Sequence, residues 1–341
     1  MKVSVVIPVY KAENFIQQAV ESALTQPETG EVILVEDNSP DNSLQICRNL
    51  ADEQENVKLL THKDGKNHGA GASRNLGIMA AKNDYVAFLD ADDFFLPSRF
   101  VTTKQLFDTD HSLECVCEAV GSHFETAEAE QKWKQLNRPL ITTIKQQLTS
   151  HELFLAHIGN INVGYFHTAG WVVKKNVFQK TGLFDEHLRL HQDTALFIRL
   201  TAVCKTRQGS VDEPVAMRRV HVHNRITAER PALQVYENKL HMWITLWQWF
   251  KKYTGENHQQ LLLSSFLRHA EMPAMASTNH LFNAFQSIRQ LTKLSIQCQG
   301  LIQEKLYRTA YLKQLRSVFD LTVYSTMISI RDRIVRKHKV K

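Results

Sequence analysis

This sequence of 341 residues lacks both a long apolar run and an ordered set of cysteines. No apolar stretch approaches the ~18 residues that a membrane-spanning helix needs, so we expect no such helix. The five cysteines are scattered, and an odd, dispersed set predicts neither a disulfide framework nor a zinc site. We therefore expect buried free thiols in a reducing compartment.

The first residues also lack a signal-peptide pattern, because a strand pattern begins at Val3. We therefore expect a cytoplasmic protein. The net charge of +6 indicates attraction to anionic partners, such as phosphates or a membrane surface. A nucleic-acid binder would need a stripe of Lys and Arg within a recognisable module. We find none in the sequence, so we expect no nucleic-acid partner.

Strand and helix patterns alternate through the first part of the chain. Continuous apolar runs predict strands at residues 3–9, 32–35, 57–60 and 85–89. Apolar side chains at helical spacing predict helices over residues 12–26, in the segment that ends near 52, and over 72–81. This alternation with short connections predicts an α/β fold, with an open, mostly parallel sheet flanked by helices.

Three carboxylates stand within four residues directly after the last of these strands, in Asp90-Ala91-Asp92-Asp93. Like charges this close disfavour each other's ionisation unless a cation compensates them. Carboxylate oxygens suit Mg²⁺ or Mn²⁺, which in turn bridge a diphosphate. A solvated acidic turn is the alternative interpretation. Residues 36–41 form a second polar cluster after a strand, so both clusters are expected at the ligand-binding rim of the sheet.

Several segments in this order resemble the large inverting glycosyltransferase family 2, which has the Rossmann-like GT-A fold. The segments are residues 5–13, 35–41, 69–77 and 90–93. The resemblance covers roughly residues 1–225 and implies a GT-A domain over 1–230. Within it, residues 1–100 would be the nucleotide-binding half and 101–230 the acceptor-binding half. From about Tyr236 helical periods replace strands, so we expect an α-helical C-terminal appendage over 231–341.

The resemblance also implies roles for residues around a nucleotide-sugar donor. Asp37 matches an acid that hydrogen-bonds the base, although Glu36-Asp37-Asn38 departs from the commoner Asp-Asp-Gly pattern. Asp90 would face the ribose and Asp92 would bind the metal, with Asp93 in support. The other nucleotide-binding residues that it implies are Pro8, Val9, Tyr10, Lys66, Arg74 and Ala91, and Asn75 completes an Arg-Asn pair that frames the pocket.

A second acidic segment is expected to supply the general base. The family carries Gly-x-Phe-Asp-Glu followed by Glu-Asp, and the second acid of that pair is the base. Here Asp193 matches the base, and Gln192 replaces the usual Glu beside the sugars. A plain helix N-cap is the alternative interpretation of Asp193. The base would deprotonate the acceptor hydroxyl as it attacks the anomeric carbon, which inverts that carbon.

Two further segments complete the predicted site. Trp171 resembles a family position near the acceptor and donor sugars, where stacking on a sugar and burial in the core are both open. We expect His167 and Thr168 to line the same cleft. Arg219-Val220-His221 fits an Arg-x-His pattern in which the histidine completes the metal site, with His223 as the alternative. Arg225 would contact the diphosphate.

The C-terminal region contains an aromatic stretch and a basic end. The spacing of this aromatic stretch makes a helix face, which favours core packing or a partner helix over an interfacial patch. Its residues are Trp243, Trp247, Trp249, Phe250 and Tyr253. Residues 328–341 are basic and partly amphipathic, so they fit either peripheral contact with anionic lipid at the inner face of the membrane or a solvated, disordered end.

Together these patterns predict an inverting, hexosyltransferase-type enzyme that uses Mn²⁺ or Mg²⁺. It would move one sugar from a nucleotide-diphosphate sugar, with UDP as the commonest carrier, to a saccharide or lipid-linked hydroxyl in cell-surface polysaccharide or glycan biosynthesis. A processive synthase would carry a Gln-x-x-Arg-Trp motif and membrane helices, and we find neither. The alternative from another class is a catalytically inactive nucleotide-binding or scaffold protein of the same fold.

Overall fold

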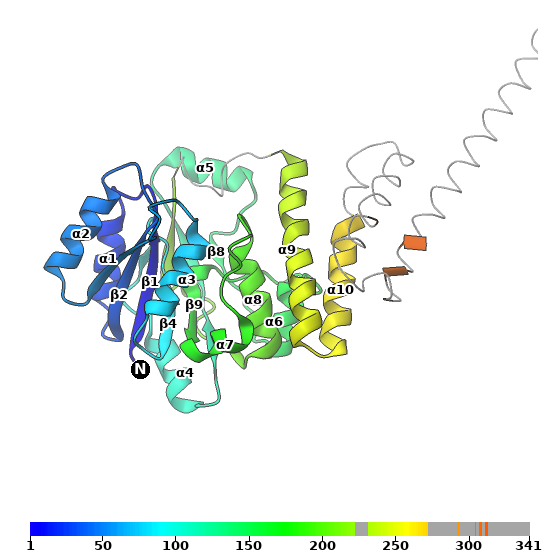
Figure 1. Ribbon diagram of the computed structural model, residues 1–341. Helices are drawn as coiled ribbons and strands as arrows, with labels where there is room; N and C mark the ends of the chain where they lie inside the picture. The colour runs from blue at the N-terminus through cyan, green and yellow to red at the C-terminus, as the bar shows by residue number, and fades with distance from the viewer. Residues whose placement is uncertain (222–230, 272–291, 293–303, 305–306, 309–310, 313–341) are drawn as a thin grey trace, which may run out of the picture. The chain divides into compact units, whose positions relative to one another are not determined.

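A computed structural model describes residues 1–221, 231–271, 292, 304, 307–308 and 311–312. The chain divides into two compact units, Met1–Pro231 and Ala232–Lys341. The fold of the first unit is an α/β arrangement, as predicted, with helices on both faces of a mixed sheet (Figure 1).

The main sheet has seven strands, and its first part is parallel. β1 (Val3–Val9) lies between β2 (Thr29–Glu36) and β4 (Tyr85–Phe88), and β3 (Val57–Thr61) pairs with the far side of β2. β9 (Trp171–Lys174) runs antiparallel to both β4 and β6 (Cys115–Cys117), and β10 (Thr206–Gln208) closes the order β10-β6-β9-β4-β1-β2-β3. The predicted strands at 3–9, 32–35, 57–60 and 85–89 are therefore confirmed to within a few residues.

Alternation along β1 explains the two helical layers. Val5 and Ile7 face a core shared with α1 (Ile16–Leu24), α2 (Ser43–Glu53) and α4 (Val101–Thr109). Val6 faces the opposite core, under α3 (Ala70–Ala80). A Cβ on Gly77 of α3 would come within 2.3 Å of Val6 Cγ1, so α3 can lie this close to the sheet only with glycine there.

The remaining elements of the first unit complete the second layer and a smaller sheet. The layer over Val6 also contains α6 (Ser150–His157), α7 (Phe178–Thr181) and α8 (Gln192–Val203). The smaller sheet has the order β5 (Phe94–Phe95), β11 (Ala216–Val220), β7 (Val120–Phe124) and β8 (Ile141–Thr142), with α5 (Ala127–Gln135) after β7. Two short 3-10 helices, η1 (Thr168–Gly170) and η2 (Lys175–Val177), flank β9.

The second unit begins with two helices that pack on each other, α9 (Ala232–Tyr253) and α10 (Glu256–Glu271). Trp243, Trp247 and Phe250 are buried, and the Trp243 ring stacks on Phe266 with centroids 6.4 Å apart. Core packing is therefore what the structure shows for these three residues of the stretch, whereas Trp249 is half-buried and Tyr253 is 52% exposed. The basic segment 328–341 lies outside the described residues.

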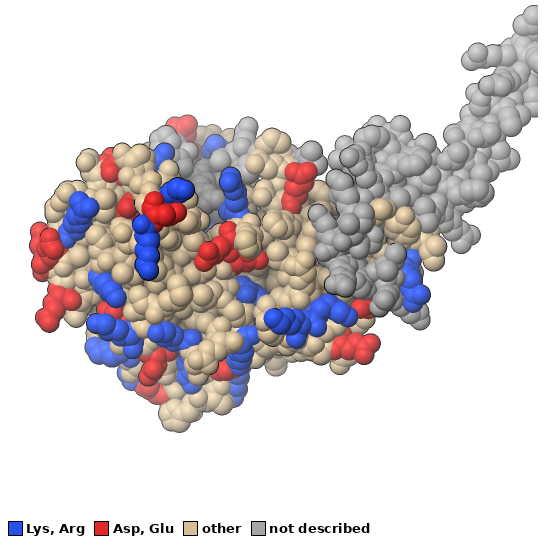
Figure 2. All heavy atoms as spheres, in the orientation of Figure 1, with Lys and Arg blue, Asp and Glu red and all other residues tan. Residues whose placement is uncertain are grey.

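The cysteines agree with the expectation of buried free thiols where the structure describes them. Cys47, Cys115, Cys117 and Cys204 are free and buried, whereas Cys298 lies outside the described residues. On the face shown in Figure 2, basic and acidic side chains are interspersed and do not form a single large basic patch. Within the described residues, no helix combines the length and apolarity needed to cross a membrane.

Candidate active site

The predicted site residues lie at the carboxyl ends of the central strands of the main sheet, at the point where the strand order reverses. The chain passes from β1 to β2 on one side of β1 and returns to β4 on the other side. A crevice forms beyond the carboxyl ends of the strands at such a switch point. The amino terminus marks the lower end of β1 in Figure 1, so this edge is the upper one. At the end of β1, Pro8 and Val9 are buried, whereas Tyr10 is 47% exposed.

Asp37 follows β2 and holds the loop that leads into α3. Its carboxylate is 2% exposed and accepts the backbone N–H groups of His68 and Gly69, each at 2.7 Å. Asn67 donates its side-chain amide to the Asp37 carbonyl at 2.9 Å. The acid therefore fixes the glycine-bearing loop beside the crevice, and its predicted contact with a nucleotide base stays a prediction.

The three acids of the turn after β4 have different surroundings. Asp90 forms an ion pair with Arg74 of α3, and its side chain is 30% exposed. The Asp92 side chain is 33% exposed, and Oδ2 lies 3.4 Å from His221 Nε2. Asp93 is 2% exposed, and burial, followed by the charges of Asp92 and Asp90, raises its pKa well above the usual range. One turn thus presents two accessible carboxylates and one buried acid.

Arg219 of β11 joins this turn to two other parts of the chain. Its backbone N–H donates to Asp93 Oδ1 at 2.9 Å, and its Nε donates to the Asp92 carbonyl at 2.9 Å. The other guanidinium nitrogens reach Glu125, after β7, and Gln18 of α1. The sequence predicted Arg219 only as part of a motif, whereas the structure shows that its side chain holds the backbone that carries Asp92.

Two sets of atoms around the acidic turn could hold a divalent cation. The predicted pair is Asp92 and His221, and His221 also stacks on Phe15 at 5.2 Å. Asp90, Asp93 and His167 form a second group, whose ligand atoms lie within 4.8 Å of one another. Oδ2 of Asp93 is buried and has no hydrogen-bond partner. Carboxylate oxygens with an imidazole fit Mn²⁺, and the carboxylates also fit Mg²⁺.

Arg74 and Asn75 of α3 contact different parts of the site. Arg74 is 7% exposed, pairs with Asp90 and lies over the Phe184 ring, with Cζ 5.4 Å from its centroid. Asn75 accepts the backbone N–H of Phe184 at 2.9 Å and donates to the Phe184 carbonyl at 2.9 Å and to Glu186 at 2.8 Å. Asn75 therefore fixes the segment that leads to Asp193, the predicted general base.

Asp193 lies in the first turn of α8, as the sequence predicted. Its Oδ1 accepts the backbone N–H of Thr194 at 2.8 Å, and the residue is half-buried. Gln192 begins the helix and turns toward α3, since a Cβ on Gly71 would lie 2.7 Å from the Gln192 amide. His191, directly before α8, has a φ of 63°, a left-handed conformation that sets the helix start.

His167 lies among the charges of both halves of the site. Burial and the charge of Arg218 lower its pKa to about 4, while Asp90 and Asp193 act in the opposite direction. The ligand atoms of His167, Asp90 and Asp93 lie within 4.8 Å of one another. His167 therefore lies against the acidic turn, and the charge of Asp193 also acts on its pKa. Its neighbour Thr168 is 3% exposed and begins η1, so it contributes little surface to a cleft.

Trp171 is a correction to the prediction that it stacks on a sugar. The side chain is 0% exposed and its ring stacks on Phe197, with centroids 4.5 Å apart and planes at 9°. Because neither ring face reaches the surface, no sugar can lie against it. The alternative interpretation, a core tryptophan, is the correct one.

Some predicted residues lie at the margin of the site, and others lie outside the residues that the structure describes. Lys66 is exposed in the loop before α3, and its backbone N–H donates to Asp64 at 3.2 Å. Ala91 is 6% exposed within the acidic turn. His223 and Arg225 lie outside the described residues, so their predicted roles stay predictions.

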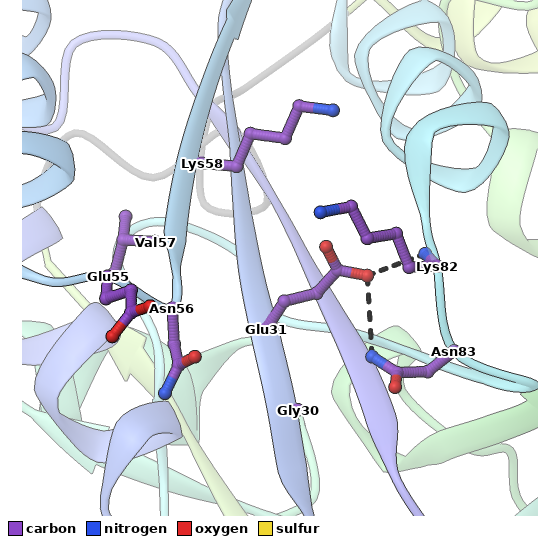
Figure 3. A pocket seen from close by; sticks show the side chains of 8 residues that line it. All are labelled: Gly30, Glu31, Glu55, Asn56, Val57, Lys58, Lys82 and Asn83. Atoms are coloured by element: carbon purple, nitrogen blue, oxygen red, sulfur yellow. Dashed lines mark hydrogen bonds between the residues drawn. The ribbon is translucent and has the colours of Figure 1, made fainter.

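A pocket at the opposite edge of the main sheet does not belong to this site (Figure 3). It is lined by residues 30–31, 55–58 and 82–83, at the amino ends of β2 and β3 and before β4, with a volume of about 340 Å³. The Glu31 carboxylate there accepts Ser4 Oγ and the backbone N–H of Lys82, both at 2.6 Å. These bonds tie the chain before β4 to β1 and β2, and none of the predicted site residues lines the pocket.

Comparison with known proteins gives a family match and several relatives. The family model described as "Glycosyl transferase family 2" matches residues 4–182. The minor teichoic acid biosynthesis protein GgaA of Bacillus subtilis is 28% identical over 218 residues, which are 62% of this chain and 45% of that protein. The glycosyltransferase YibD of Escherichia coli is 37% identical over 131 residues, 38% of this chain and 37% of that protein. The matched part thus spans half or less of these relatives.

A third relative and two solved structures are also similar. The poly(ribitol-phosphate) beta-glucosyltransferase of Bacillus spizizenii is 39% identical over 97 residues, 28% of this chain and 15% of that protein. Residues 1–349 of S. aureus TarS match with a TM-score of 0.64 and 17% identity over 93% of this chain and 89% of that one. The complex of the same fragment with UDP matches with a TM-score of 0.59, at 18% identity and the same coverage. The structural likeness shows the fold alone and confirms the GT-A architecture.

Proposed function

Because the chain belongs to glycosyl transferase family 2, we propose that it transfers a single sugar from a nucleotide-diphosphate sugar to an acceptor hydroxyl, with inversion. The observation that carries the proposal is the acidic turn, where the ligand atoms of Asp90 and Asp93 lie within 4.8 Å of those of His167, together with the charge of Asp193 that acts on the same histidine. A donor held at the acidic turn would have its anomeric carbon facing a base on α8, which is the arrangement that in-line displacement needs.

The donor is proposed to lie along the carboxyl ends of β1, β2 and β4. Asp37, Tyr10 and Lys66 would surround the base, and Asp90, paired with Arg74, would face the ribose. UDP is the proposed nucleotide, since a TarS fragment with this fold was crystallised with UDP and with UDP-GlcNAc. The guanidinium of Arg74 also brings positive charge to the side of the crevice where the diphosphate would lie.

A divalent cation is the proposed cofactor, with Asp92 and His221 as its ligands. A bound Mn²⁺ or Mg²⁺ would stabilise the charge that develops on the leaving diphosphate. The mannosyltransferase PcManGT, whose structure contains GDP-Man and Mn²⁺, matches this chain with a TM-score of 0.50 at 14% identity over 93% of this chain and 85% of that one. On this chain's own side, Arg219 holds the Asp92 backbone in place for such a role.

Asp193 is the proposed general base. It would take the proton of the acceptor hydroxyl as that oxygen bonds to the anomeric carbon and the bond from that carbon to the diphosphate breaks. The products are the inverted glycoside and the nucleoside diphosphate. Gln192, beside Asp193, would contact the sugars, and Arg225 would contact the diphosphate.

A saccharide or a lipid-linked glycan of the cell surface is the proposed acceptor. Two relatives carry names that refer to teichoic acid biosynthesis or to poly(ribitol-phosphate), which supports a cell-surface polymer. We further propose that the protein works in the cytoplasm, with its basic residues 328–341 against the inner face of the membrane. Deletion of these residues should then abolish binding to anionic liposomes, and unchanged binding would contradict the membrane proposal.

A panel of nucleotide sugars with Mn²⁺ or Mg²⁺ tests the function, read by donor hydrolysis and by thermal shift. We expect one donor, in the presence of metal, to stabilise the protein and to be hydrolysed slowly without acceptor. If no nucleoside diphosphate with metal stabilises the chain, the proposal is wrong. Stabilisation without turnover of any donor, with any acceptor, would favour the alternative of an inactive nucleotide-binding protein.

A further inference from the structure

Arg218 of β11 is a buried cation without an ion pair. Its side chain is 5% exposed, and Nη2 donates to Ser122 Oγ at 3.2 Å. Nε and Nη1 are buried and have no hydrogen-bond partner, and no described carboxylate forms an ion pair with Arg218. Burial lowers the pKa of this guanidinium, although Tyr165 and the charge of Asp93 partly offset the effect. Buried N–H groups of a guanidinium that lack acceptors are costly unless a ligand supplies them.

A second guanidinium stands beside the same tryptophan. Arg218 Cζ lies 4.4 Å and Arg138 Cζ lies 6.0 Å from the centroid of Trp133. The Trp133 ring is buried and its Nε1 donates to the Pro139 carbonyl at 3.2 Å, so it is a fixed platform for both cations. Arg138 is half-buried, forms no ion pair among the described residues, and is close enough to Arg218 for their charges to repel. Two adjacent cations of this kind favour an anion between or over them.

These cations border the candidate active site on the side of His167. Arg218 precedes Arg219, whose backbone N–H bonds Asp93, and strand alternation sends the two side chains to opposite faces of β11. Tyr165, which is 41% exposed, lies two residues before His167. The Arg218 charge also acts on His167, as the charge of Asp193 does. The two arginines and Tyr165 therefore all belong to residues 101–230, the expected acceptor-binding half, and Arg218 directly precedes the residue that bonds the acidic turn.

We propose that Arg138, Arg218 and the hydroxyl of Tyr165 form a subsite for a phosphate group of the acceptor. Arg138 and Tyr165 present the accessible atoms, and Arg218 supplies a fixed charge behind them. Guanidinium groups suit phosphate because their N–H donors match its oxygens in pairs. This inference rests on the proposed function, since it assigns the acceptor an anionic group close to the hydroxyl that receives the sugar.

The phosphate could come from a phosphodiester within the acceptor polymer or from the diphosphate of a lipid carrier, and one titration distinguishes them. The full chain is saturated with UDP and Mn²⁺ to fill the donor site and is then titrated calorimetrically with a glycerol phosphate trimer or with geranyl diphosphate. Glycerol and geraniol are the neutral counterparts. We expect one of the two phosphate probes to bind and neither neutral counterpart to do so.

Variants then locate the binding. Arg138→Gln should lower the affinity for the phosphate probe by about tenfold or more, because a charge-assisted contact is lost. Tyr165→Phe, a change at an exposed side chain, should lower this affinity by a smaller factor. Arg48→Gln, which removes the same charge from the exposed side of α2, should leave it unchanged.

Equal affinities of Arg138→Gln, Tyr165→Phe and Arg48→Gln for the probe would overturn the subsite, as would tight binding of a neutral counterpart or no binding of either phosphate probe by the wild type. Thermal stabilisation of the protein by UDP with Mn²⁺ is measured first, and it separates the two proposals. Its absence would contradict the proposed function, whereas its presence with no phosphate binding would contradict only the subsite.

Discussion

At the residue scale, acids that are neighbours in the sequence have different surroundings in the structure, and these surroundings could not be predicted from the sequence alone. Asp90, Asp92 and Asp93 were predictable as one acidic turn after a strand. Their separate environments depend on Arg74, from α3, and on Arg219, from β11. Trp171 shows the same limit, because its family position suggested a sugar contact and its partner Phe197 on α8 makes it part of the core.

The assignment of Asp193 as general base leads to a prediction about transfer and binding. Asp193→Asn should lower the rate of transfer by about 10²–10⁴-fold, since a positioned base contributes that much. The affinity for the nucleotide should stay within about twofold, because the hydrogen bonds of Asp193 among the described residues go to Thr194, outside the proposed nucleotide pocket. The measurements are product formation and calorimetric titration with UDP and Mn²⁺.

Asp52→Asn, on the exposed side of α2, is the matched control and should change neither quantity. If Asp193→Asn loses nucleotide binding as well as transfer, the base has been assigned to the wrong residue.

At the scale of elements, a single helix couples the two halves of the site. Arg74 of α3 pairs with the acidic turn, while the next residue, Asn75, holds the backbone of Phe184 ahead of α8. The sequence predicted α3 and its Arg-Asn pair. It also predicted the segment that contains Phe184, because residues 182–186 match the Gly-x-Phe-Asp-Glu pattern of the family. It could not predict their contact, because 109 residues separate Asn75 from Phe184.

Removal of the Asn75 side chain should therefore affect both stability and catalysis. Asn75→Ala leaves the buried N–H and C=O groups of Phe184 without partners, which should lower the free energy of unfolding by about 1–3 kcal/mol. Transfer should fall further than UDP affinity, because the loosened segment carries the start of α8. Urea unfolding and paired kinetic and binding measurements check this.

Asn49→Ala, at an exposed position on α2, provides the comparison, with an expected change of no more than about 0.5 kcal/mol. Equal effects of the two substitutions would show that Asn75 does not hold the segment.

Most strands of the smaller sheet could not be predicted from the sequence. The apolar runs of β1, β2 and β4 are strong patterns because these strands are covered on both faces. β5 and β8 have two residues each, and β11 contains Arg218 and Arg219, so none of them carries a strand pattern. Pairing of β11 with β7 and β5 buries these arginines beside the acidic turn, and this pairing brings His221 to Asp92.

At the scale of the whole molecule, one buried histidine should make stability depend on pH. His157 of α6 bonds the Leu153 carbonyl at 2.7 Å through Nδ1, while its Nε2 is buried without a partner. Burial lowers the pKa of this imidazole to about 4. The unfolded chain therefore binds a proton near pH 6.5 that the folded chain does not bind until near pH 4.

Stability should thus fall as the pH drops from about 6.5 toward 4, by at most about 1.4 kcal/mol per pH unit from this group. His157→Gln removes the group and should make that part of the profile less steep, while His167, whose pKa is also about 4, still contributes. Urea unfolding of both proteins at pH 7 and pH 5 measures the difference. Parallel profiles for the two proteins would contradict the role of His157.

The central claim, a metal-dependent nucleotide site at the acidic turn, is tested most directly by calorimetric titration of UDP with and without Mn²⁺, in the wild type and in Asp92→Asn. We predict that Mn²⁺ tightens UDP binding to the wild type by about tenfold or more and that Asp92→Asn loses most of this gain, because it removes a metal ligand. UDP affinity that is the same with and without Mn²⁺ in the wild type, or an undiminished gain in Asp92→Asn, would contradict the account.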